Sequence, residues 1–140
     1  MKITLFRVNE NFHFETKNEN GNVVHLDHSS AENPQGPSPM ELLLMGIAGC
    51  SGIDIVSILR KQQLELSDLK MEVEGVRIPG AVPNVFTEIL MKIFMEGDIP
   101  KNKAQRAVDL SIEKYCSVAK MLEKTAKIEY TVFLNDEALK

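Results

Sequence analysis

Six segments of the chain alternate apolar and polar residues, which is the pattern of β-strands that bury one face. Three lie near the N-terminus and three lie farther along: residues 2–8, 11–17, 23–27, 69–78, 85–95 and 127–134. Residues 18–22 are rich in Asn and Gly and predict a turn between the second and third strands. Residues 28–38 are rich in proline and predict an irregular loop, the kind of segment that often carries function.

Two longer segments repeat apolar residues at three-and-four spacing, which is typical of α-helices. The first covers residues 39–63 and has strong start signals. Ser38 suits the N-cap, Pro39 suits the first helical position, and Glu41 completes an S-x-x-E capping box. The second helix follows Pro100 and extends to about residue 122. The predicted order is βββ-α-ββ-α-β.

This order indicates an α+β fold, with a largely antiparallel sheet around a long central helix. No internal repeat divides the chain, so residues 1–140 are predicted to form a single domain. The first helix is apolar or small on nearly every side over residues 42–53, and such a helix must be buried all round. One chain of this size has too few other residues to cover the helix on every side, so we expect an obligate homodimer. The apolar stretch has 12 residues, fewer than the roughly 20 of a membrane span, so no membrane partner is expected.

Composition and charge argue against several classes of function. The formal net charge is −4 and no dense basic stripe occurs, which argues against a nucleic-acid partner. The N-terminus lacks the features of a signal peptide, so we expect a cytoplasmic protein. The two cysteines, Cys50 and Cys116, are too few for a secreted disulfide framework and too isolated for a zinc ribbon. In a reducing cytosol, two such cysteines are either small buried side chains of the core or a redox-active pair.

Each cysteine has two interpretations from the residues alone. Cys50 follows Gly46 and Gly49, so it is either a small side chain in a closely packed stripe or the start of a new helix after a break. A helix N-terminus would stabilise the reactive thiolate. Cys116 falls four residues after Ile112 on the apolar side of the second helix, where it can again be an ordinary core side chain. Spacing does not decide whether the two sulfurs meet.

Two segments resemble the active-site segments of a known family. Residues 36–50, GPSPMELLLMGIAGC, followed by DIVSIL at residues 54–59, resemble the first such segment of the OsmC/Ohr family, the osmotically induced and organic-hydroperoxide-resistance proteins. Residues 113–120, EKYCSVAK, resemble the second. The resemblance covers essentially the whole chain and is greatest to the OsmC-like branch of short, uncharacterised members. It implies an intertwined homodimer, with two long helices at the centre of sheets that both chains contribute.

The resemblance also implies a chemistry, the thiol-dependent reduction of organic hydroperoxides. In the family a thiolate attacks the O–O bond, becomes a sulfenic acid, and is resolved by a second cysteine as a disulfide. By position, Cys50 would be the peroxidatic thiol and Cys116 the resolving thiol. A dithiol, lipoyl-linked in the Ohr branch, would then restore the pair. No metal or other cofactor is expected from this chemistry.

Two further catalytic residues follow from the resemblance, with departures from the family pattern. Peroxidase members hold the thiolate beside an N-terminal Arg, which is oriented by a Glu ten residues before the first cysteine. Here Met40 occupies that position, and Glu41 stands nine residues before Cys50. A continuous helix would separate Glu41 from Cys50 by roughly 13 Å along its axis, so Glu41 takes part only if the helix breaks near residues 46–49. Arg7, in the N-terminal sheet, is the preferred arginine.

Two function hypotheses stay open at this point. The first is a cytoplasmic thiol peroxidase that uses Cys50, Cys116, Glu41 and Arg7. The second is a stress-associated or small-molecule-binding dimer that keeps the cysteine pair without peroxidase activity. Met40 favours the second hypothesis, because peroxidase members carry Glu at this position. The arginine also favours it, because the residues alone do not decide between Arg7 and Arg77. A third interpretation, metal binding by both cysteines and a histidine, lacks paired ligand spacing.

Overall fold

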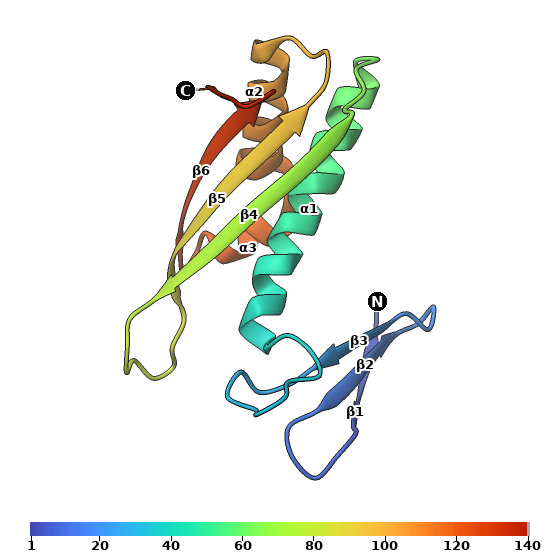
Figure 1. The fold of residues 1–140 in the computed structure, drawn as a ribbon, viewed down its shortest axis with the longest axis vertical. Coiled ribbons are helices and arrows are strands. Elements are labelled where there is room, and N and C mark those ends of the chain that lie inside the picture. The colour runs from blue at the N-terminus through green and yellow to red at the C-terminus, as the bar shows by residue number, and fades with distance from the viewer. Residues whose placement is uncertain (140) are drawn as a thin grey trace. The chain divides into compact units, whose positions relative to one another are not determined.

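The computed structural model describes residues 1–139 and shows two compact units, Met1–Leu43 and the described residues from Leu44 onward (Figure 1). The first unit contains a three-stranded sheet and the second a four-stranded sheet with helices. Helices and mainly antiparallel strand pairs confirm the predicted α+β class. The prediction of a single domain over residues 1–140 stays a prediction.

The first unit is an antiparallel meander of three strands, as predicted. Its strands are β1 (Ile3–Arg7), β2 (Phe14–Asn18) and β3 (Val23–Leu26). β2 begins at Phe14 rather than at residue 11, and the reason is local. Asn9 Oδ1 accepts hydrogen bonds from the backbone N–H groups of Asn11 and His13, so the preceding residues turn instead of extending.

The irregular loop predicted after β3 is ordered by Asp27. Its buried carboxylate accepts hydrogen bonds from the backbone N–H groups of Gln35 and His28, at 3.0 and 2.7 Å. These two bonds hold the pKa of Asp27 below its usual value. Farther along the loop, a Cβ atom at Gly36 would lie 2.4 Å from the carbonyl oxygen of His25, so the loop can approach β3 only with glycine there.

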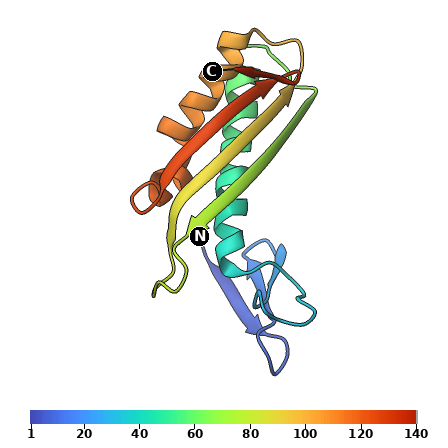
Figure 2. The same ribbon diagram turned by 60° about the vertical axis from the view of Figure 1, so that its left-hand side comes forward.

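The second unit packs helices on one face of its sheet (Figures 1 and 2). Its elements, in chain order, are α1 (Pro39–Lys61, which begins in the first unit), β4 (Asp68–Arg77), β5 (Phe86–Glu96), α2 (Lys101–Leu110), the π-helical turn η1 (Ser111–Tyr115), α3 (Ser117–Leu122), β6 (Lys127–Leu134) and β7 (Glu137–Leu139). The strand order in the sheet is β4-β5-β6-β7. β6 has the bounds that the alternation predicts.

The four-stranded sheet is mixed, which corrects one detail of the prediction. β4 and β5 pair antiparallel, whereas β5 and β6 pair parallel because the α2–η1–α3 segment crosses over between them. β7 was not predicted. It pairs antiparallel with β6 after a tight turn in which Asn135 and Asp136 have φ values of 49° and 65°. Asn and Asp tolerate this left-handed conformation, and the Asn-Asp pair was the missed signal.

Helix α1 buries one line of side chains and leaves the other side open. Ile47, Ser51, Ile55 and Leu59, four residues apart, are fully buried. On the open side, Met45 is 55% exposed and Ile53 is 71% exposed. The prediction that α1 is buried on every side is therefore wrong for one chain. The homodimer that was expected to cover the open side stays a prediction.

By length and composition, α1 is long and apolar enough to cross a membrane. The 12-residue argument from the sequence therefore does not exclude a span, because the helix has 23 residues. Core helices of soluble proteins pass the same test, and here Gly52 lies against Leu69 and Met71 of β4. We interpret α1 as the core helix of the second unit.

Candidate active site

The helix that carries Cys50 is unbroken. α1 runs from Pro39 to Lys61 without interruption, so the proposed helix start at Cys50 is wrong. The capping box is confirmed at the N-terminus of α1. There the Ser38 N–H donates to Glu41 Oε2 at 2.7 Å, and the Glu41 N–H donates to Ser38 Oγ at 3.3 Å. These bonds lower the pKa of Glu41. Glu41 lies nine residues before Cys50, about 13 Å along the axis, so the helix break that would bring it to the thiol is absent.

The helix break lies at the other cysteine. The single helix predicted after Pro100 divides into α2, η1 and α3, and Cys116 stands between the last two in an extended conformation. Its N–H donates to the Ser111 carbonyl at 2.7 Å, which closes the wider π-helical turn. Cys116 becomes the N-cap of α3, and its Sγ accepts the N–H of Ala119 at 3.3 Å. Of the two interpretations of Cys50 that the sequence left open, the one with a helix start is wrong, and the helix start lies at Cys116 instead.

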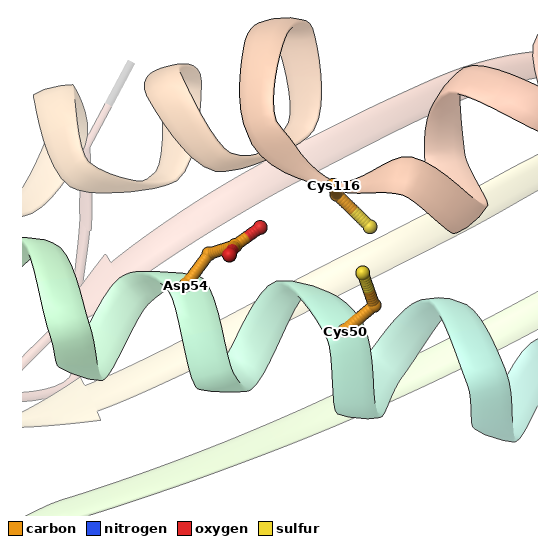
Figure 3. A group of neighbouring side chains, drawn as sticks. All are labelled: Cys50, Asp54 and Cys116. Atoms are coloured by element: carbon orange, nitrogen blue, oxygen red, sulfur yellow. The ribbon is translucent and has the colours of Figure 1, made fainter. Parts of the chain in front are cut away.

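The break brings Cys116 to the middle of α1, where the two thiols face each other (Figure 3). The Sγ atoms of Cys50 and Cys116 and a carboxylate oxygen of Asp54 all lie within 4.8 Å of one another. Both cysteines are free thiols. Cys116 is fully buried, whereas Cys50 is half-buried. The structure therefore brings the sequence-predicted pair together, from elements 66 residues apart in the chain.

Two buried serines tie the facing elements together. Ser51 Oγ donates to Cys116 Sγ at 3.5 Å. Ser111 Oγ lies 3.3 Å from both the Ser51 carbonyl and Asp54 Oδ2, and its one proton is shared between these acceptors. Burial raises the pKa of the Cys116 thiol, and the neighbouring Cys50 raises it further, while the bonds from Ser51 and Ala119 oppose both effects. Cys116 is thus held in its neutral form at pH 7.

No arginine among the described residues of the second unit donates a hydrogen bond to either thiol. Among its described residues, no Lys or Arg forms an ion pair with Asp54 or donates a hydrogen bond to either sulfur. Arg77 lies on β4 with its guanidinium over the Phe86 ring, 5.8 Å from the centroid. Arg7, in the first unit, donates to the backbone carbonyls of Glu10 and Asn11. The assignment of Arg7 to the site stays a prediction. The condition set for Glu41, a helix break near residues 46–49, is not met.

Sequence reasoning missed Asp54 as a member of the cluster. The signal was present, because Asp54 follows Cys50 by four residues and is therefore on the same side of α1, one turn along. The metal interpretation assumed a histidine as the third group. The structure instead places a carboxylate beside the two thiols.

Comparison with known proteins identifies the family. The sequence profile of the family described as OsmC-like protein matches residues 31–131. This chain belongs to the OsmC family. The OsmC-like chain is 40% identical over 123 residues to Protein YhfA of Escherichia coli (strain K12), covering 87% of this chain and 90% of the relative. The resemblance stated from the sequence is confirmed.

Solved structures agree with the family assignment. The OsmC-like chain is similar to a hypothetical protein from Aquifex aeolicus VF5, with 32% identity, 96% of both chains covered and a TM-score of 0.80. It also shares its fold with the organic hydroperoxide resistance protein OhrB of Bacillus subtilis, with 20% identity, 96% of both chains covered and a TM-score of 0.64. The chain is thus an OsmC family member with a close pair of free thiols.

Proposed function

We propose that this OsmC family member reduces organic hydroperoxides with Cys50 as the attacking thiol. The observation that carries the proposal is the approach of the two sulfurs within 4.8 Å inside this fold. Cys50 is the half-buried thiol that a substrate can reach, and the fully buried Cys116 is suited to resolve the product. The structural relative OhrB, an organic hydroperoxide resistance protein, supports this substrate class.

The reaction proceeds in two balanced steps. The Cys50 thiolate attacks one oxygen of ROOH, the O–O bond breaks, and the alkoxide leaves and takes up a proton to become an alcohol, with a sulfenic acid on Cys50. Cys116 sulfur then attacks Cys50 sulfur, the S–O bond breaks, and water leaves as the disulfide forms. A dithiol reductant, lipoyl-linked in the Ohr branch, restores both thiols by exchange. We place the reaction in the cytoplasm, where thiols are kept reduced.

The leaving alkoxide needs a cationic donor, which the described residues of the second unit do not supply through any hydrogen bond to the thiols. We assign this role to Arg7 of the N-terminal sheet. Glu41 is not assigned to the site, because the unbroken helix keeps it about 13 Å from Cys50 along the axis. Removing one such donor from an active site lowers turnover by about 100- to 1,000-fold. Arg77, which lies over Phe86, serves as the matched control.

The test measures cumene hydroperoxide consumption with dihydrolipoamide as reductant. We expect no activity in Cys50→Ser, a loss of about 100-fold in Arg7→Ala, and wild-type rates in Arg77→Ala. Mass spectrometry after one equivalent of peroxide should show loss of two hydrogen atoms in the wild type and gain of one oxygen atom in Cys116→Ser. A wild type that keeps both free thiols contradicts the proposal.

The second candidate function is a dimer that keeps the thiols without peroxidase activity. Its specific support is Met40 at the position where peroxidase members carry Glu, together with the unbroken helix between Glu41 and Cys50. A wild type no faster than free dihydrolipoamide, with Arg7→Ala unchanged, would favour it.

Both candidates use a homodimer, which we propose is formed through the open side of α1. Met45 and Ile53 are large apolar side chains exposed on this side, where they alternate with the small exposed residues Gly49 and Ser57 at four-residue spacing. Sedimentation should give twice the mass of one chain for the wild type and the mass of one chain for Ile53→Lys. Lys61→Glu, at the polar C-terminal end of α1, is the control and should leave the mass unchanged.

A further inference from the structure

We propose that the reduced Cys50–Asp54–Cys116 cluster binds a thiophilic divalent cation, namely Zn²⁺. Each of the three residues offers one ligand atom, and these atoms lie within 4.8 Å of one another (Figure 3). Two sulfurs bound to one tetrahedral Zn²⁺ are about 3.8 Å apart, from a Zn–S length of about 2.3 Å. The cluster therefore fits the ion after side-chain movements of no more than about 1 Å.

The ligands stand on two elements that hold them in place. Cys50 and Asp54 are four residues apart on the unbroken helix α1, the same spacing by which two histidines of a helical metal motif share one ion. Cys116 comes from the facing side, where its backbone is fixed by the π-helical turn and by the start of α3. Opposed ligands on rigid elements need little reorganisation to bind an ion.

Each of two ligands also has a partner that orients it. Ser51 Oγ and the Ala119 N–H both donate to Cys116 Sγ, at 3.5 and 3.3 Å. Ser111 Oγ lies 3.3 Å from Asp54 Oδ2. Hydrogen-bond donors of this kind stabilise the anionic form of a ligand and fix its direction, as in the outer shell of known zinc sites.

The charges of the cluster favour a cation. Binding of the ion displaces the thiol protons, so the two thiolates and the carboxylate then carry three negative charges. No Lys or Arg among the described residues of the second unit forms an ion pair with Asp54. Two sulfur ligands select zinc over magnesium or calcium, which prefer oxygen. Asp54 also lines a surface depression with Ser57, Lys61 and Tyr115, which gives the ion a path from solvent. With three protein ligands, the fourth position is left for water.

Metal binding and disulfide formation exclude each other at this site. Oxidation by a hydroperoxide converts the zinc-bound thiolate pair, ROOH and two protons into the disulfide, an alcohol, water and free Zn²⁺. The disulfide offers no thiolate, so the ion is released. Binding itself needs only the reduced thiols, so it does not depend on the peroxidase proposal.

The experiment titrates the reduced full chain with Co²⁺ and then Zn²⁺, without oxygen or peroxide. Thiolate-to-cobalt absorption in the near ultraviolet reports sulfur ligation, and competition with a chromophoric chelator gives the zinc affinity. We expect one ion per chain, no thiolate band in Cys50→Ser, and an affinity at least tenfold lower in Asp54→Asn than in the exposed-carboxylate control Asp98→Asn. The wild type oxidised to its disulfide should lose the band, which tests the thiols without any substitution that could disturb folding.

Three results would overturn the metal site. They are the absence of a thiolate band in the reduced wild type, an equal zinc affinity in Cys50→Ser, and an unchanged affinity in Asp54→Asn. Because no peroxide is present, these outcomes are separate from a failure of peroxidase activity, which is assayed with a chelator in excess.

Discussion

The two helical segments that carry the cysteines behave in opposite ways. α1 contains Gly46, Gly49 and Gly52 and yet runs unbroken through Cys50. The α2–η1–α3 segment has no Gly or Pro between residues 101 and 122 and yet breaks at Cys116. Glycine inside a helix costs about 1 kcal/mol relative to alanine, so local propensity predicts the reverse. Packing decided both cases.

The difference follows from what each segment contacts. α1 buries a line of four residues completely, and this burial keeps the helix unbroken despite its glycines. In the second segment, the fully buried Ser111 lies at the start of the π-helical turn, with its hydroxyl directed at the Ser51 carbonyl and Asp54. A π-helical turn inside an α-helix often marks a functional site. Here it directs a thiol at its partner.

The largest expected effect concerns the buried line of α1. Ile55 is fully buried, and truncation to alanine removes apolar contacts and leaves a cavity. We expect Ile55→Ala to lower the free energy of unfolding by about 2–5 kcal/mol, measured by urea denaturation. Met121→Ala, at a position on α3 that is 72% exposed, is the control and should change it by less than about 0.5 kcal/mol. Equal effects would mean that burial does not hold α1.

A smaller effect is expected at the break. Ser111→Ala removes the hydroxyl shared by the Ser51 carbonyl and Asp54, and should lower the free energy of unfolding by about 1 kcal/mol. Because the hydroxyl links α1 to the π-helical turn, disulfide formation between Cys50 and Cys116 should also slow. Ser117→Ala, at an exposed position beside Cys116, is the control for both measurements. Unchanged disulfide formation in Ser111→Ala would remove Ser111 from the positioning of the thiol.

The smallest effect is a pH dependence set by Cys116. Burial raises the pKa of Cys116 in the folded state, so above the ordinary thiol pKa the unfolded chain releases a proton that the folded chain keeps. Stability due to this group is therefore complete below about pH 8.5 and falls as pH rises, by less than about 0.7 kcal/mol between pH 8.5 and 9. Urea denaturation should show a shallower fall in Cys116→Ala than in Cys50→Ser. Equal slopes in both variants would contradict the assignment.

Much of the fold was readable from local pattern. Alternation of side chains predicted six of the seven strands, and the capping box predicted where α1 begins. These features depend on neighbours within a few residues, so the sequence specifies them directly. The seventh strand, β7, was missed because three residues are too few to show alternation. Its Asn-Asp turn was the only local sign.

The candidate site also has features that follow from local sequence and features that depend on residues distant in the chain. The sequence by itself determined the two thiols, the family and the i, i+4 placement of Asp54 beside Cys50, because these rest on residue identity and helix period. Only the tertiary structure decided that the second helix breaks at Cys116, that β5 and β6 pair in parallel, and that a carboxylate shares the site with the thiols. Each of these depends on contacts between residues distant in the chain, such as Ser111 with Ser51, whose burial outweighs the local preference of the backbone.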